Sequence, residues 1–149
     1  MQFSIIVPVF NEAPLIQPFL RHLRERAPEA EIIVADGGSS DGTPELARDF
    51  CDQLVMSKPN RAVQMNLGAR GASGDVLWFV HVDAEVPHKC LNEISRMLDD
   101  PTVVGGFFRI RLTARTSLSI DGQLCVLRRR FASNAVWGSR DILPTQCLP

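Results

Sequence analysis

Short runs of β-branched and apolar residues alternate along the chain with stretches in which apolar residues recur at helical spacing. The runs are Phe3–Val9, Glu31–Ala35, Gln53–Met56, Val76–Val82 and Val103–Leu112. Residues 5–7 and 32–34 are continuously apolar, as in strands covered on both faces. Strands that alternate with helices predict parallel strands joined by right-handed crossovers. The expected fold class is therefore α/β, with a mostly parallel central sheet and helices on both faces.

Four stretches between or after these runs are expected to be helices. The apolar face of the first consists of Leu15, Phe19, Leu20 and Leu23. In the second, Thr43 fits the N-cap position, and Pro44 fits the first helical position, where a missing N–H costs nothing. The third is expected over residues 61–72 and the fourth over residues 87–98.

The charge and length of the chain exclude several classes of protein. The chain has 149 residues, with 16 Lys and Arg against 17 Asp and Glu, which suits one domain without a broad basic face for nucleic acid. No apolar run approaches the ~20 residues that a membrane span needs, and the N-terminus lacks a signal-peptide pattern. The four cysteines are widely spaced and are expected to be free thiols. We therefore expect a cytoplasmic protein that does not bind nucleic acid.

Polar and glycine-rich segments follow three of the predicted strands. They are Asn11-Glu12 after the first strand, residues 36–43 (DGGSSDGT) after the second, and His81-Val82-Asp83 at the end of the fourth. In an open α/β sheet, ligands bind beyond the carboxyl ends of the strands. Each segment also has a structural explanation, since Asp36 can serve a turn, Asp83 a helix cap or loop, and His81 the core. Their joint placement favours one shared site.

The chemistry of this site suggests a nucleotide bound with a divalent cation. Neither a G-x-G-x-x-G segment nor a P-loop is present. Carboxylates repel a diphosphate unless a cation lies between them, and Mg²⁺ or Mn²⁺ binds to carboxylates, water and phosphate oxygens. Asp83 is the natural metal ligand, Asp36 can accept hydrogen bonds from a base or ribose, and Arg61 can supply positive charge to the diphosphate.

The order of these motifs resembles glycosyltransferase family 2. The resemblance rests on residues 4–12 (SIIVPVFNE), 31–43 (EIIVADGGSSDGT), 61–69 (RAVQMNLGA), 72–75 (ASGD) and 81–83 (HVD), and it extends to about residue 112. The Arg-x-x-Gln-Met-Asn segment and the His-x-Asp ending are similar to those of one bacterial subgroup. The resemblance implies a GT-A fold, a Rossmann-like sandwich, and a nucleotide-activated sugar donor, usually a UDP-sugar, bound with Mn²⁺ or Mg²⁺.

The same resemblance implies roles for individual residues. Those expected at the nucleotide are Pro8, Asn11, Glu12, Asp36, Asp41 and Arg61. Within this set, Asp36 would hold the base and Arg61 would approach the nucleotide or diphosphate. Asp83 corresponds to the last acid of the D-x-D motif and would carry the metal. His81 stands where most of the family has Asp, and it is the second candidate ligand.

The second half of the family's pattern is where the sequence departs most. An inverting transferase needs a general base for the acceptor hydroxyl, and the family places it in an acidic pair. Beyond Leu112 the only acids are Asp121 and Asp141, and neither fits that pair. We expect a donor-binding part over residues 1–112, and an incomplete acceptor-side segment or irregular tail over 113–149, with the acceptor half truncated. The acceptor and the general base are not identified.

Two functions therefore remain open, together with one minor possibility. The chain is a glycosyltransferase acting on an unknown acceptor, or a non-catalytic nucleotide-sugar-binding module that lacks its base. A nucleotidyltransferase is disfavoured, because it needs a basic glycine-rich loop after the first strand, and residues 8–12 contain none. The cluster Arg128-Arg129-Arg130 would suit peripheral contact with an anionic membrane, but a solvated face explains it better.

Overall fold

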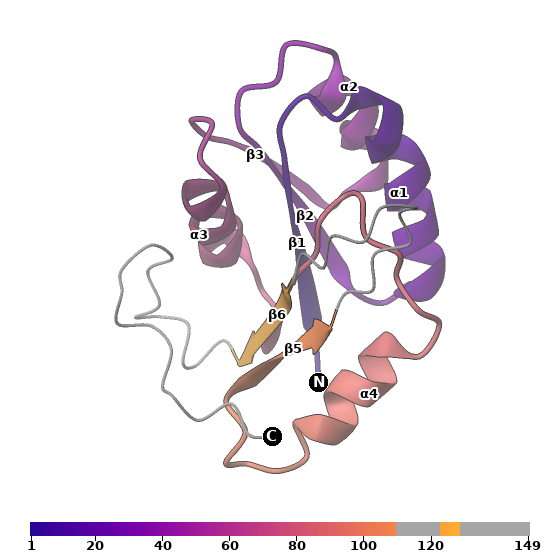
Figure 1. The fold of residues 1–149 in the computed structure, drawn as a ribbon, viewed down its shortest axis with the longest axis vertical. Coiled ribbons are helices and arrows are strands. Elements are labelled where there is room, and N and C mark those ends of the chain that lie inside the picture. Colours follow the sequence, from indigo (N-terminus) through magenta and orange to yellow (C-terminus); the bar gives the residue numbers. More distant parts are fainter. Residues whose placement is uncertain (110–122, 129–149) are drawn as a thin grey trace, which may run out of the picture.

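The computed structural model describes residues 1–109 and 123–128, and in them one six-stranded sheet. Its strands are β1 (Phe3–Val9), β2 (Glu31–Asp36), β3 (Gln53–Met56), β4 (Val76–Phe79), β5 (Gly105–Arg109) and β6 (Gln123–Arg128). They lie in the order β3-β2-β1-β4-β6-β5 (Figure 1). The first four in this order are parallel, and β6 runs antiparallel to both β4 and β5. The predicted α/β class with a mostly parallel sheet is confirmed.

Helices cover both faces of this sheet. They are α1 (Ala13–Arg26), α2 (Thr43–Ala47), α3 (Arg61–Gly71) and α4 (Cys90–Met97), with a 3₁₀ turn over Arg48–Phe50. Side chains along β1 alternate between the two faces of the sheet, so the core has two parts. Ile5 and Val7 face the side of α1, α2 and α4, whereas Ile6 faces α3. Figure 1 shows α3 and α1 on opposite sides of the sheet. The expected two-sided covering is therefore present.

Three local predictions differ from the structure. Leu15 is 46% exposed, and Ile16 is the fully buried residue at that turn of α1, because α1 turns positions 16, 19, 20 and 23 toward the sheet. The N-cap of α2 is Gly42, with φ +91°, so Thr43 is the first helical residue. Strand β4 ends at Phe79, and His81 therefore lies in the turn that follows it.

Helix α3 approaches the central strand β1 very closely. A Cβ atom on Gly68 would lie 2.5 Å from Cγ2 of Ile6, nearer than real Cβ contacts come. The buried side chain of Gln64 reaches past this contact, and its Nε2 donates to the carbonyl oxygens of Val9 at 2.6 Å and Ala35 at 2.8 Å. Glycine at one position and an amide at the other therefore fix α3 against the carboxyl ends of β1 and β2.

Strand β6 falls inside the segment 113–149 and lies between β4 and β5 in the sheet. Asp121, Asp141, Arg129, Arg130 and Cys147 lie outside the described residues. Among the described cysteines, Cys51 and Cys90 are free thiols, as expected. In the same part of the chain, no helix is both long and apolar enough to cross a membrane.

Candidate nucleotide-sugar site

The carboxyl ends of β2, β1 and β4 lie next to one another in the sheet. The chain crosses from β1 to β2 and β3 on one side, and then returns to place β4 on the other side of β1. The strand order therefore reverses between β1 and β4, which is where ligands bind in open α/β sheets. Asp36 closes β2, Asn11 and Glu12 follow β1, and Asp83 follows β4. The three strand ends named by the sequence thus converge on one edge.

Asp36 is fully buried at this edge, and only one of its carboxylate oxygens is satisfied within the described residues. Oδ1 accepts hydrogen bonds from the backbone N–H groups of Gly38 and Ser39, both at 2.7 Å. Oδ2 is buried and has no hydrogen-bond partner there. A buried acceptor left unpaired costs about 1–3 kcal/mol. Asp36 therefore shapes its own turn and also presents a free acceptor at the strand end.

The loops after β1 and β2 are joined by side-chain to backbone hydrogen bonds. Asn11 adopts a positive φ of 55°, and its Oδ1 accepts from Ser40 N at 3.0 Å. The carboxylate of Asp41 accepts from Ala13 N at 3.0 Å and from Thr43 Oγ1 at 2.6 Å. The hydroxyl of Thr43 in turn accepts from Glu12 N at 2.9 Å. Asn11 and Asp41 therefore position the loops around the site.

These hydrogen bonds also act on the ionisation of Asp41. The hydroxyl of Thr43 and the backbone N–H of Ala13 both donate to its carboxylate and lower the pKa of Asp41. The charged form is thereby favoured, and it is the form that can accept all of these hydrogen bonds. Asp41 thus remains an anion that holds the two loops together.

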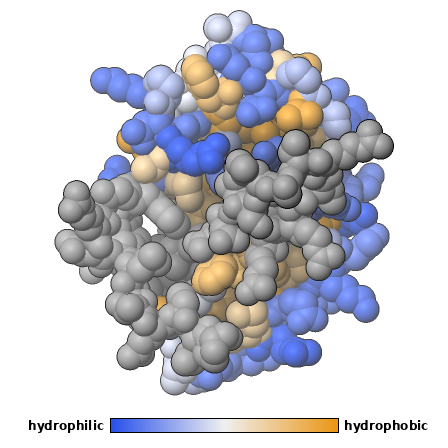
Figure 2. Space-filling view, in the orientation of Figure 1, coloured by the Kyte–Doolittle hydropathy of each residue, from blue (hydrophilic) through white to orange (hydrophobic). Residues whose placement is uncertain are grey.

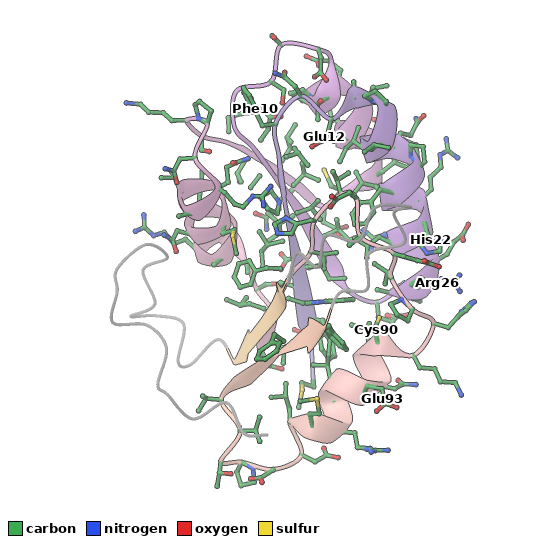
Figure 3. The ribbon with its side chains drawn as sticks, viewed as in Figure 1. Phe10, Glu12, His22, Arg26, Cys90 and Glu93 are labelled. Carbon is green, nitrogen blue, oxygen red and sulfur yellow. The ribbon has the colours of Figure 1, made fainter. Side chains whose placement is uncertain are left out.

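Pro8 and Phe10 occupy the end of β1. Pro8 is buried and pairs with Ala35 of β2. Ile6 O accepts from Val80 N, and because backbone groups alternate along a strand, the nitrogen of Pro8 points to the same side, beyond the end of β4. The missing N–H of Pro8 therefore ends the ladder between β1 and β4, whose last pair is Ile6 and Phe79. Phe10 is 47% exposed and lies with Glu12 at the upper end of the molecule (Figure 3).

Helix α3 begins at the same edge with Arg61. Asn60 caps it, since its Oδ1 accepts from Val63 N at 3.1 Å. One turn later, Gln64 makes the two hydrogen bonds to β1 and β2 described above. Sequence reasoning did not assign roles to Gln64 and Phe10. The signals were an amide among the apolar positions of a helix and an aromatic residue directly after a buried strand.

His81 and Asp83 lie in the turn after β4, which a hydrogen bond from Ala84 N to His81 O closes at 3.0 Å. Asp83 is exposed, whereas His81 is half-buried and its Nδ1 has no hydrogen-bond partner among the described residues. Burial lowers the pKa of His81, and the charge of Arg61 lowers it further, against the opposing effect of Asp83. The turn thus brings Asp83 and His81 within electrostatic reach of Arg61.

The turn after β4 fits a divalent cation that shares its ligands with a substrate. Nowhere in the described residues do three or more His, Cys, Asp or Glu side chains cluster closely enough to hold a metal alone. Mg²⁺ and Mn²⁺ at phosphate sites take one or two protein ligands and complete their shell with phosphate oxygens and water. The exposed carboxylate of Asp83 can supply one such ligand, whereas the unpartnered Nδ1 of His81 is buried.

Comparison with known proteins settles the family. The model of "Glycosyl transferase family 2" matches residues 4–133. The chain belongs to glycosyltransferase family 2. This family 2 chain is 34% identical over 111 residues to the succinoglycan biosynthesis protein ExoA of Rhizobium meliloti, covering 68% of the chain and 33% of that protein. It is 30% identical over 145 residues to the glycosyltransferase AglJ of Haloferax volcanii, covering 93% of the chain and 47% of that protein.

Two solved structures of similar fold are glycosyltransferases in complex with nucleotide sugars. The mannosyltransferase PcManGT of Pyrobaculum calidifontis, in complex with GDP-Man and Mn²⁺, has a TM-score of 0.73 at 25% identity over 89% of this chain and 46% of its own. Staphylococcus aureus TarS 1–349 in complex with UDP-GlcNAc has a TM-score of 0.73 at 18% identity, covering 89% and 47% of the two chains. The chain thus spans about a third to a half of the length of these four proteins.

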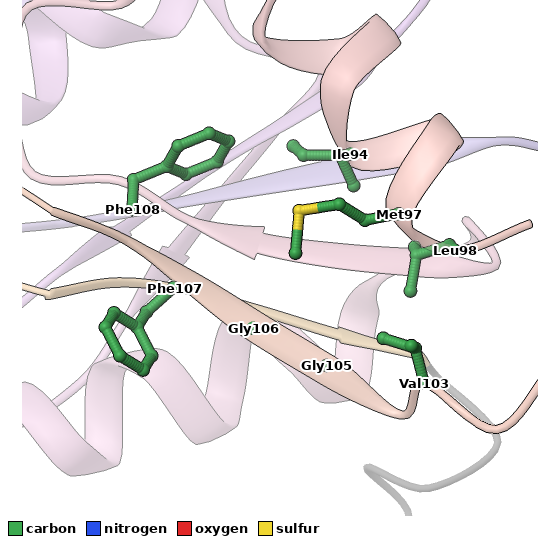
Figure 4. A pocket seen from close by; sticks show the side chains of 8 residues that line it. All are labelled: Ile94, Met97, Leu98, Val103, Gly105, Gly106, Phe107 and Phe108. Carbon is green, nitrogen blue, oxygen red and sulfur yellow. The ribbon is translucent and has the colours of Figure 1, made fainter. Parts of the chain in front are cut away.

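A pocket of the family 2 chain lies elsewhere, between α4 and β5 (Figure 4). Ile94 and Met97 of α4 face Phe108 of β5, whereas the ring of Phe107 points to the other side of the strand, and none of the residues that line the pocket is ionisable. Met97 and Phe107 are about half exposed, at 52% and 49%, and Figure 2 shows apolar side chains on this face of the molecule. A pocket without charged or polar side chains cannot hold a diphosphate or a cation, so the strand ends remain the candidate site.

Proposed function

We propose that this chain carries the donor-binding part of a glycosyltransferase that transfers a sugar from a nucleoside-diphosphate donor, a UDP-sugar, with the help of Mn²⁺ or Mg²⁺. The observation that carries the proposal is the free, buried Oδ2 of Asp36 at the reversal point of the sheet. A ligand that donates a hydrogen bond there would remove the cost of the unpaired acceptor.

The carboxylate of Asp36 favours nucleobases that can donate a hydrogen bond to it. An ionised carboxylate only accepts hydrogen bonds. Uracil and guanine can donate to it from a ring N–H, whereas adenine and cytosine can donate only from an exocyclic amino group and leave an unprotonated ring nitrogen beside the carboxylate. The exposed ring of Phe10, at the end of the neighbouring strand, offers a surface on which a base can stack. GDP-Man and UDP-GlcNAc, the ligands of two structural neighbours, both carry bases of the selected kind.

The diphosphate would lie between the start of α3 and the turn after β4. Arg61 offers a guanidinium to the phosphate oxygens, and Asp83 offers a carboxylate to a cation, with His81 beside it. A cation held there would supply positive charge to stabilise the diphosphate leaving group. Asn11, Glu12 and Asp41 join the loops around the nucleotide, and Pro8 lies beside them near the end of β1. We retain residues 1–112 as the donor-binding part and residues 113–149 as the acceptor side.

Calorimetric titration with UDP in the presence of Mn²⁺ tests the proposal. The native chain should bind UDP, and Asp83→Ala should abolish the dependence of that binding on Mn²⁺. Asp36→Asn should weaken binding even without metal, because it places an N–H where the base needs an acceptor. Asp49→Asn, an exposed acid in the 3₁₀ turn, is the matched control and should bind as the native chain does. Absence of UDP binding, or unchanged Mn²⁺ dependence in Asp83→Ala, would contradict the proposal.

The second candidate is a nucleotide-sugar-binding module without transfer activity. Its support is that Asp121 and Asp141 are the only acids beyond Leu112, and neither fits the family's acidic pair. Mass spectrometry separates the two functions by following UDP release from UDP-sugars with and without candidate acceptors. Acceptor-dependent release indicates a transferase. Tight UDP binding without any acceptor-dependent release indicates the binding module.

A further inference from the structure

The amide of Gln64 is a buried polar group that lies directly behind the candidate site. Gln64 is 4% exposed, and its Nε2 donates to Val9 O at 2.6 Å and to Ala35 O at 2.8 Å. The nitrogen of a glutamine side chain carries two hydrogens, so these two bonds use both of them. One side chain of α3 thus joins the carboxyl ends of β1 and β2.

The two carbonyl groups that Gln64 holds directly precede the two residues proposed to contact the base. Val9 is followed by Phe10, and Ala35 is followed by Asp36. Because a peptide group is planar, fixing its carbonyl oxygen also fixes the direction in which the next Cα atom lies. A single amide therefore constrains where both Phe10 and Asp36 begin.

Contacts of Gly37 connect the turn after β2 to the same amide. Val9 O also accepts from Gly37 N at 2.9 Å, so its two acceptor positions are filled by this turn and by Gln64. A Cβ atom on Gly37 would lie 3.1 Å from Nε2 of Gln64, which is closer than most real Cβ contacts. The turn that shapes Asp36 therefore packs directly on the amide.

The sheet does not need this amide to set the register of its strands. Strands β1 and β2 pair along their length, and Val9 and Asp36 form the last pair. Gln64 adds its two hydrogen bonds at this end of the ladder, where the candidate site begins. A buried amide costs desolvation and side-chain entropy that a smaller apolar residue would avoid. Its position is the one expected of a residue that serves the site.

We propose that Gln64 is a positioning residue for nucleotide recognition, because its amide sets the separation between Phe10 and Asp36 in which the base lies. This inference rests on the proposed function, since it concerns the base pocket of the same site. Gln64 acts through the two strand ends and needs no contact of its own with the nucleotide. Loss of the amide should therefore weaken the binding of a nucleotide and spare a ligand that has no base.

Calorimetry with UDP and with inorganic diphosphate, each in the presence of Mn²⁺, separates these two effects. Gln64→Met removes both N–H donors from a side chain of similar length, and Gln64→Glu replaces them with acceptor oxygens. In both variants the affinity for UDP should fall at least about tenfold, because base stacking and one hydrogen bond together are worth that much. The affinity for diphosphate should stay as in the native chain.

A matched control shows that lost stability alone does not produce this difference. Ser4 is also fully buried, and its hydroxyl donates to Glu31 and accepts from Gly74 N at the amino ends of the strands. Ser4→Ala should lower the melting temperature, as the Gln64 variants do. It should leave the affinities for UDP and for diphosphate unchanged.

Nuclear magnetic resonance of the native chain gives a measurement that needs no variant. With Mg²⁺ as the cation, UDP should shift the side-chain amide signals of Gln64, because the base binds to the residues that follow its two carbonyl partners. Inorganic diphosphate should not shift them. The amide of Gln53, which donates to Glu31 and to Gly71 O, should stay unshifted with either ligand.

The outcomes separate this inference from the proposed function. If the native chain binds UDP, an equal fall in the affinities for UDP and diphosphate, or no fall in either, would overturn the positioning role of Gln64 alone. Amide signals of Gln64 that UDP leaves unshifted would overturn it as well. Absence of UDP binding by the native chain would overturn the proposed function and this inference together.

Discussion

The close approach of α3 to β1 leads to a prediction about Gly68. Substitution by alanine adds a Cβ atom 2.5 Å from Cγ2 of Ile6, whereas ordinary contacts begin at 3.4 Å, so the helix and strand must separate locally by about 0.9 Å. Ile6 is fully buried in the central strand and has no room to retreat. The added methyl group therefore displaces α3, which carries Arg61 and Gln64 to the candidate site.

The expected loss of stability follows from two opposing effects. Alanine in place of glycine inside a helix stabilises by about 1 kcal/mol. Overpacking of a well-packed core costs about 1–3 kcal/mol, and a contact this short against a central strand belongs at the upper end of that range. The free energy of unfolding should therefore fall by about 1–2 kcal/mol. For a domain of this size, the melting temperature should fall by roughly 2–8 °C.

Thermal and urea denaturation of matched variants measure this effect. Gly71→Ala, at the last residue of the same helix, places its Cβ only against the end of the Gln53 side chain, and its stability should be equal to or higher than that of the native chain. In an Ile6→Ala background, which removes Cγ2, Gly68→Ala should raise stability, because only the helix propensity remains. A native-like or higher melting temperature for Gly68→Ala alone would refute the reasoning.

Three further predictions concern the site and the opposite end of the sheet. Gln64→Leu removes two hydrogen bonds of about 0.5–1.5 kcal/mol each, and urea denaturation should show a loss of about 1–3 kcal/mol. Phe10→Ala should weaken UDP binding by about 1–3 kcal/mol in calorimetry and leave the melting temperature unchanged, since the ring is exposed. Burial alone would raise the pKa of Glu31, but hydrogen bonds from Ser4, Ser73 and Gln53 outweigh it and lower the pKa below its ordinary 4.5. The native chain should therefore be more stable than Glu31→Gln above that pH, and urea denaturation should show the advantage disappearing as the pH falls through the lowered value. An advantage that persists in acid would contradict this role for Glu31.

Much of the fold follows from local patterns in the sequence. The continuous apolar runs at Ile5–Val7 and Ile32–Val34 predict strands covered on both faces, and both are fully buried there. The N-terminus of α2 was less predictable, because Thr43 and Gly42 both suit a cap. The positive φ of Gly42 decides between them, together with the hydrogen bonds that Thr43 N and Thr43 Oγ1 donate to the carboxylate of Asp41.

Tertiary contacts explain what the sequence did not reveal. The strand β6 has no strong local pattern, and its place between β4 and β5 is set by pairing with residues 48 to 52 positions earlier in β4. Leu15 and Ile16 are adjacent and equally apolar, so only the orientation of α1 on the sheet decides that Ile16 is buried. From the sequence alone, Gln64 would be expected on the surface. In the fold it is buried, because β1 and β2 place two carbonyl oxygens within reach of its amide.

The sequence predicted where in the sheet the candidate site lies, but not how its side chains are arranged. Asp36, Asp83 and Arg61 could be named because parallel strands end at one edge of the sheet. The structure adds that one carboxylate oxygen of Asp36 accepts a hydrogen bond from the turn while the other has no partner among the described residues. It also shows that Asn11 and Asp41 join two loops. These distinctions depend on backbone positions that spacing alone does not specify.

A crystal structure of the chain with UDP and Mn²⁺, recorded with anomalous scattering from manganese, tests the central claim most directly. The account predicts one manganese peak bound to the carboxylate of Asp83 and to the diphosphate, with the uracil ring N–H donating to Oδ2 of Asp36. Manganese bound away from the turn after β4, or uracil bound away from Asp36, would contradict it.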